Sequence, residues 1–358
     1  MNPTLRRAGL AIAGTAVAAG VLESLLLLAS FSHPPAPDPF ATLFAEGRVD
    51  GAELHVRDER ELWKPIPGAR VPWGGDGLDA HGFRNGPIAV ERADGVARIA
   101  VLGGSAMLGR GVSREEACIQ VAARELAAAG VACEAINAAV SGTTLAQGIE
   151  RWLATVRPFR PDVVAAAFGA DEEHDPALGA SDLELIERRA PPPGVVARVA
   201  RRLARESQIG QLAAWIGSGS TPSIEPQETP AAGPFDPAGE PDWPRARRMS
   251  VDDFAAGLRR LEAVVRADGA RLVLVDLARR PSLVRSAPVL ERYSAALREF
   301  AAERSIPLVD GKAAFAAAVR DGATYAELFN GPADPGILGH AALGRELARA
   351  IRPLLPRK

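Results

Sequence analysis

The chain has 358 residues, of which 47% are hydrophobic and 24% are charged, so it can form a full hydrophobic core and is not disordered throughout. Its 42 lysine and arginine residues nearly balance 44 aspartate and glutamate residues, and this formal net charge of −2 argues against a nucleic-acid-binding protein. The two cysteines, Cys118 and Cys133, are too few for a disulfide framework and lack metal-site spacing. They either pair in an oxidising compartment or remain two thiols.

An apolar run begins after two arginines near the N-terminus. The run covers residues 8–30, with Glu23 as its one charged residue. A helix of about 20 apolar residues can cross a bilayer, and basic residues before it remain in the cytoplasm. We therefore expect residues 1–32 to be a cytoplasmic stub and a membrane anchor, with the rest of the chain outside the cytoplasm. A cleaved signal peptide, followed by secretion, is the alternative, because residues 30–32 have a small-x-small pattern.

The next segment, residues 33–95, is rich in turn formers. It opens with HPPAPDP, a stiff proline-rich spacer, and continues with many prolines and glycines between short extended pieces. This composition predicts an irregular or β-rich preamble to the main domain.

Short apolar strands alternate with amphipathic helices from residue 96 to the C-terminus. Helices are expected after the capping box that starts at Ser113, near Leu145, after Ser250, near Val289 and from Gly339. Strands are expected at residues 98–102, 134–138, 163–168, 271–276 and 306–310. Such alternation predicts a three-layer α/β/α domain over residues 96–358, with a central five-stranded parallel sheet.

The alternation lapses over residues 176–249. A basic amphipathic stretch is followed there by a segment rich in proline, glycine, serine and glutamate. We expect a flexible, solvated insertion. A lid over the site and a helix on the membrane surface are the alternatives.

Four polar segments stand where ligands bind in such a domain, beyond the carboxyl ends of the strands. They cover residues 103–109, 137–144, 168–175 and 334–340. The third contains acidic residues that either bind a divalent cation through oxygen ligands or form a solvated loop, and we expect the loop. We expect no metal and no cofactor.

These segments, in this order and spacing, resemble the SGNH/GDSL hydrolase superfamily. HGFRNGP at residues 81–87 and RIAVLGGSAMLGRGV at residues 98–112 are similar to the entry to membrane-anchored bacterial members, and the likeness continues to residue 351. The resemblance implies a serine esterase, deacylase or acyltransferase acting on a small acyl ester or an acylated envelope carbohydrate. It also implies a periplasmic domain tethered to the bacterial inner membrane.

The resemblance also assigns roles to residues. Ser105 corresponds to the nucleophile, and the backbone N–H groups of Ser105 and Gly142 to the oxyanion hole. Asp171 stands in the slot of an oxyanion-binding asparagine. His340, oriented by Asp334, is a candidate for the base that activates the serine.

The sequence departs from the family pattern at several of these positions. Gly104 replaces an aspartate, and Asp171, an acceptor when ionised, replaces a donor. When Gly339 and His340 are matched to the family's Gly-His pair, Asp334 falls in the slot of the catalytic histidine.

Two hypotheses therefore remain open. The first is an active enzyme that uses His340 or His174 as the base. The second is a catalytically degenerate protein that serves as a binding or assembly module at the cell envelope.

Overall fold

The computed structural model describes residues 18, 20–22, 24, 25, 52–174, 181–189, 247–331 and 333–355. The chain divides into two compact units, one made of residues 1–41 and 190–231 and the other of residues 42–189 and 232–358. In the first unit the described positions are helical. Most of the expected anchor and most of the expected insertion lie outside the described residues. Among the helices that are described, none is long and apolar enough to cross a membrane.

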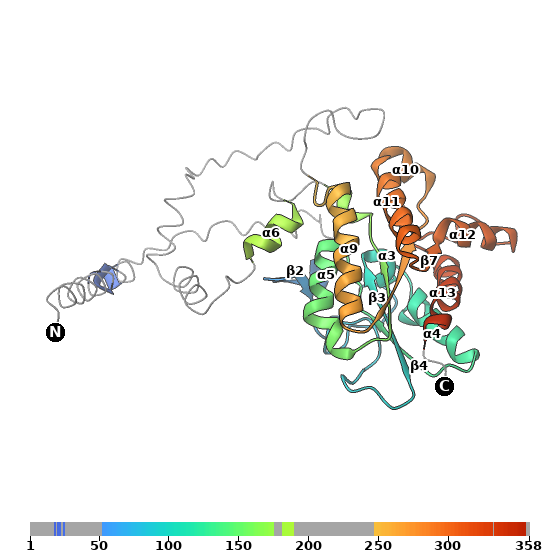
Figure 1. Cartoon of the computed structure of the whole chain (residues 1–358), viewed down its shortest axis with the longest axis horizontal. Helices are drawn as coiled ribbons and strands as arrows, with labels where there is room; N and C mark the ends of the chain where they lie inside the picture. Colours follow the sequence, from blue (N-terminus) through green and yellow to red (C-terminus); the bar gives the residue numbers. More distant parts are fainter. Residues whose placement is uncertain are drawn as a thin grey trace. The chain divides into compact units, whose positions relative to one another are not determined.

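Five parallel strands form the centre of the second unit (Figure 1). They are β3 (Ala97–Gly103), β4 (Cys133–Asn137), β5 (Val163–Ala167), β6 (Arg271–Asp276) and β7 (Leu308–Asp310). The predicted strands are confirmed to within two residues at each end. The spatial order is β4-β3-β5-β6-β7, which is the flavodoxin-like order. The strand order reverses beside β3, so the carboxyl ends of β3 and β5 mark the expected ligand site.

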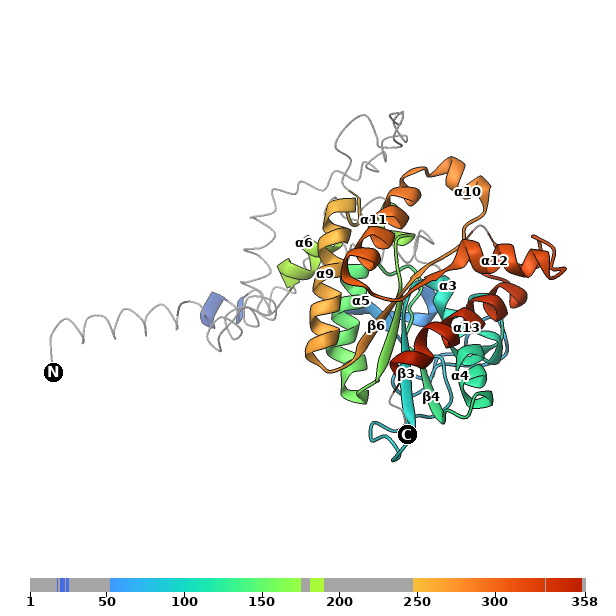
Figure 2. The ribbon, with the colours of Figure 1, turned by 45° about the vertical axis from the view of Figure 1, so that its right-hand side comes forward.

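Helices cover both faces of this sheet (Figure 2), as the three-layer prediction requires. One face is covered by α4 (Cys118–Ala128) and α13 (Ile337–Ile351), which pack together so closely that a Cβ on Gly344 would lie 2.4 Å from the Cβ of Val121. On the other face lie α5 (Leu145–Arg151), α9 (Val251–Ala267) and α11 (Val289–Arg304). The expected capping box is present, but it opens a 3₁₀ turn, Arg114–Glu116, just before α4.

Several short elements were not predicted individually. The segment expected to be irregular or β-rich contains an antiparallel hairpin, β1 (His55–Asp58) and β2 (Leu62–Pro65). The other unpredicted elements are the helices α3 (Ser105–Leu108), α6 (Asp182–Arg189), α10 (Pro281–Ser286) and α12 (Gly311–Arg320). The sequence did carry a signal for α12, because Asp310 caps it by accepting a hydrogen bond from Ala313 N–H and alanine favours helix. Cys118 and Cys133 are free thiols.

The HGFRN segment connects the end of β4 with the end of α3 through a buried arginine. The Arg84 side chain is fully buried, and its guanidinium donates to the carbonyl oxygens of Leu108 and Val112 at 3.0 and 2.7 Å. Its charge is paired with the carboxylate of Asp76. The backbone N–H of Arg84 donates to the carbonyl of Asn137, at the end of β4. Arg84 therefore joins the end of β4 to the end of α3 and to the residues that follow this helix.

We expect Arg84→Ala to lower the free energy of unfolding by about 3 to 5 kcal/mol, because it leaves Asp76 and several carbonyl groups without their partner. Urea unfolding followed by tryptophan fluorescence measures the change. The matched control is Arg349→Ala, whose guanidinium is 72% exposed and pairs with Glu346 on the surface. That control should change stability by less than about 1 kcal/mol. Equal losses in the two variants would contradict a structural role for Arg84.

Candidate active site

Ser105 stands at the carboxyl end of β3, where a ligand site is expected. The strand ends at Gly103, Gly104 continues in extended conformation, and Ser105 begins the short helix α3. The serine is half-buried. Within the described part of the chain, the backbone N–H groups of Ser105 and Gly142 have no hydrogen-bond partner. These two donors therefore remain without an acceptor among the described residues.

The hydroxyl of Ser105 donates directly to a carboxylate. Its Oγ lies 2.8 Å from Oδ1 of Asp334, which is 7% exposed. The other carboxylate oxygen, Oδ2, lies 3.8 Å from the guanidinium of Arg110. Asp334 is held in place by its own carbonyl, which accepts from the backbone N–H of Asn330. The structure thus brings Asp334 to the serine with no histidine between them.

His340 lies in the core, not in the site, and this corrects the expectation that it is the base. The residue is fully buried in α13, and its Nδ1 accepts from the backbone N–H of Cys118 at 3.2 Å. Its Nε2 is buried and has no partner among the described residues. Burial, with a smaller contribution from the charge of Arg84, lowers the pKa of His340 to about 3. The side chain is therefore a neutral imidazole fixed between α13 and α4, and it makes no hydrogen bond to Ser105.

His174, the alternative base, is also separate from the serine. Its side chain is 61% exposed, and its Nδ1 lies 3.8 Å from a carboxylate oxygen of Glu173. Among the described residues, Asp334 is the hydrogen-bond partner of the Ser105 hydroxyl, and neither candidate histidine contacts it.

Asp171 lies against the serine loop. It opens the 3₁₀ turn Asp171–Glu173 after β5. A Cβ built on Gly104 would lie 2.6 Å from Oδ2 of Asp171. The carboxylate therefore fills the space that any side chain at position 104 would need. Gly104 stands where the resemblance implies an aspartate, and Asp171 stands where it implies an asparagine. In the structure these two residues are packed against each other.

Glu172 is a buried residue next to Asp171 whose structural role sequence reasoning missed. It was expected to lie in a solvated acidic loop, but its side chain is fully buried. Its two carboxylate oxygens accept from the backbone N–H groups of Leu145 and Gly169, each at 2.8 Å. Burial first, and then the charge of Asp171, raise the pKa of Glu172 to about 7. This carboxyl joins the loop after β5 to the start of α5.

Arg248 supports the loop that contains Gly142, and it too was missed. Its guanidinium donates to the carbonyl of Gly142 at 2.6 Å and pairs with Asp182 at 2.8 Å. The same group donates to the side chain of Gln147. Arg248 stands at the end of the expected insertion, where the sequence has no regular pattern and no short motif that would indicate its role.

The described residues of the acidic loop do not form a metal-binding site. Among all the residues that the structure describes, no group of three or more histidine, cysteine, aspartate or glutamate side chains could hold an ion. Asp175, which belongs to this loop, lies outside the described residues.

Solved structures similar to this chain include those of two hydrolases. A lipase/acylhydrolase from Enterococcus faecalis matches with 17% identity and a TM-score of 0.45, covering 73% of this chain and 98% of that one. An acetyl xylan esterase from Geobacillus stearothermophilus matches with 15% identity and a TM-score of 0.44, covering 73% and 97%. No family model and no curated relative matches the sequence. Structural similarity at these low identities shows the fold alone. The chemistry of the site depends on the residues around Ser105.

We expect the stability of the protein to fall as pH rises through the titration of Glu172. The folded carboxyl keeps its proton up to about pH 7, whereas the unfolded chain releases it near 4.5, so the native state binds more protons between these values. The free energy of unfolding should then decrease across this window, by at most about 3 kcal/mol. Urea unfolding of the wild type and Glu172→Gln across the window measures the difference in slope.

In that comparison the titration of His340 cancels, because both proteins contain it. Glu173→Gln, at a partly exposed neighbouring carboxyl, is the matched control and should keep the wild-type slope. The same slope in Glu172→Gln and in the wild type would show that Glu172 titrates alike in the folded and unfolded states, and would contradict the prediction.

Proposed function

We propose that this chain is a member of the SGNH/GDSL superfamily that uses its serine site to bind a ligand, without turning over acyl esters. The observation that carries the proposal is the 2.8 Å hydrogen bond from Ser105 to Asp334, in the slot where the resemblance expects a histidine. A carboxylate is a much weaker base for a serine hydroxyl than an imidazole, because its pKa lies further from that of the hydroxyl and from neutral pH.

The charge at the site also disfavours acyl transfer. The tetrahedral intermediate carries an oxyanion, which donors stabilise and carboxylates repel. Asp171 stands where the family has a donating asparagine, and Asp334 adds a second carboxylate at the serine. Loss of one oxyanion donor alone costs about 10² to 10³ in rate.

The same groups suit a ligand that donates hydrogen bonds. Asp171 and Asp334 accept, and the Ser105 hydroxyl can accept from a ligand while it donates to Asp334. Sugar hydroxyls have this chemistry, so we propose an envelope carbohydrate as the ligand class. The apolar run at residues 8–30 supports export and anchoring in the bacterial inner membrane, with the domain in the periplasm.

A second candidate function is a slow serine acyl hydrolase with Asp334 as the base. It is favoured by the direct contact between Asp334 and the nucleophilic hydroxyl, and by the N–H groups of Ser105 and Gly142, which have no partner in the described chain. Its substrate class would be a small acyl ester or an acylated carbohydrate.

Hydrolysis of an activated acetyl ester by the full-length chain separates the two candidates. If the site only binds, the wild type should be no faster than Ser105→Ala, because no competent base activates the hydroxyl. A wild-type rate that falls in both Ser105→Ala and Asp334→Asn would contradict the binding proposal and establish the hydrolase. A rate that is equal in all three proteins would come from groups outside the site.

Restoring the family's residues should create activity. In the double variant Asp334→His with Asp171→Asn, the histidine supplies a base and the asparagine a donor. We expect ester hydrolysis to rise by about 10² to 10⁴-fold over the wild type, the usual contribution of general-base catalysis. The matched control adds Ser105→Ala to the same double variant and should abolish the gain. No gain in a folded double variant would show that the fold has lost more than these two groups.

A further inference from the structure

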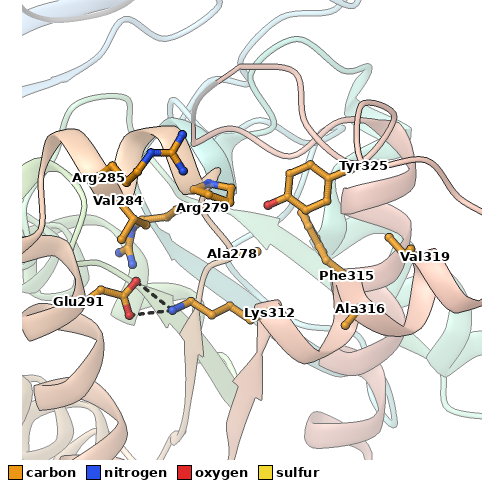
Figure 3. Close-up of a pocket in the computed structure, with 11 residues that line it drawn as sticks. Ala278, Arg279, Val284, Arg285, Glu291, Lys312, Phe315, Ala316, Val319 and Tyr325 are labelled. Carbon is orange, nitrogen blue, oxygen red and sulfur yellow. Dashed lines mark hydrogen bonds and ion pairs between the residues drawn. The ribbon is translucent and has the colours of Figure 1, made fainter.

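A pocket lies between α10, α11 and α12, and no residue of the serine site lines it. Its volume is about 460 Å³, within the range of about 300 to 1,000 Å³ that small-molecule sites occupy. Figure 3 shows Phe315 and Val319 on one side, Val284 and Arg285 on the other, and Ala278 between them. Tyr325 stands above Phe315 in the same view.

The walls of the pocket are largely apolar and partly uncovered. Val319 is 43% exposed and Tyr325 is 45% exposed, although both are large hydrophobic side chains. Phe315 behind them is buried and packs edge-on against Phe329, with ring centroids 5.0 Å apart. A ligand that covered Val319 and Tyr325 would remove apolar surface from water and so gain free energy.

The charge in the pocket is positive. Lys312 and Glu291 neutralise each other at 2.8 Å, as the dashed lines in Figure 3 show. Arg285 is exposed on the rim and has no hydrogen-bond or ion-pair partner within the described part of the chain. Arg279 is buried, and its Nε has no partner there either. Its nearest carboxylate, that of Asp276, is 3.9 Å away and already binds Arg298.

We propose that this pocket binds a medium-chain carboxylate, with the alkyl chain against Phe315 and Val319 and the carboxylate at Arg285. An apolar wall beside an unpaired guanidinium suits an amphiphile with an anionic head, because arginine binds carboxylates through charge-assisted hydrogen bonds. A cationic amphiphile of the same length would meet the same walls and be repelled by Arg285. The site is independent of the proposed function at Ser105, whose carboxylates would repel this ligand.

Photo-crosslinking of the full-length chain in lipid nanodiscs tests the site directly. The probe is a ten-carbon fatty acid with a diazirine near its end, and mass spectrometry maps the labelled peptide. We expect the label on the peptide that contains α12 and Tyr325, competed by octanoate and not by octyltrimethylammonium. Arg285→Glu should reduce labelling by about tenfold, the loss expected for one hydrogen bond to a charged group. Ala316→Trp, which fills the pocket from α12, should abolish it.

The matched control is Arg320→Glu, the same charge change at an exposed residue of α12 that does not line the pocket. It should label like the wild type. Circular dichroism of each variant confirms folding, and Val319→Asp replaces Ala316→Trp if the latter does not fold. Equal competition by the cationic amphiphile, or equal labelling in wild type and Arg285→Glu, would overturn the proposal. Labelling confined to other peptides would overturn it too.

Discussion

The buried guanidinium of Arg84 is the interaction on which the rest of the serine site depends. A fully buried charge is tolerated only when its hydrogen-bond donors have partners, and here the partners are Asp76 and carbonyl groups at the end of α3 and just after it. Those carbonyls end a helix of four residues, which is too short to be stable alone. The amide of the neighbouring Asn85 accepts from Asn137 N–H, so the loop after β4 is fixed by the same segment. The position of Ser105 is thus set from a segment that lies before the sheet in the chain.

The sequence predicted the sheet well because buried parallel strands are continuous apolar runs bounded by turn residues, as in VVAAAF and RLVLVD. It also placed Ser105, Gly142 and Asp171 in segments that follow three of the strands, since the alternation of strands and helices along the chain carries that information. The short elements were harder. α3 has four residues and makes its stabilising contacts with Arg84 and Asn137, which no local pattern reveals.

The base was mispredicted for a related reason. Asp334 and His340 are close in the sequence and are residue types that form catalytic pairs. Their closeness in the sequence does not show which side of the helix His340 occupies. His340 lies one turn into α13, on the side that faces α4, so its ring meets Cys118 and not the serine. Glu172 was expected to be exposed to solvent, because runs of acidic residues usually are, but it is buried. Its burial is explained by the backbone N–H groups of Leu145 and Gly169, which donate to its carboxylate.

The fit of the Asp171 carboxylate against Gly104 couples the substitutions that these two positions can accept. A side chain at position 104 needs the volume that Oδ2 of Asp171 now occupies, and an acidic one would add a like charge beside it. A side chain at position 104 would therefore require the Asp171 carboxylate to rotate away from the serine loop, or a different residue at position 171. Substitutions at the two positions should therefore be non-additive in stability, and an acidic residue at position 104 should be tolerated best when residue 171 is uncharged.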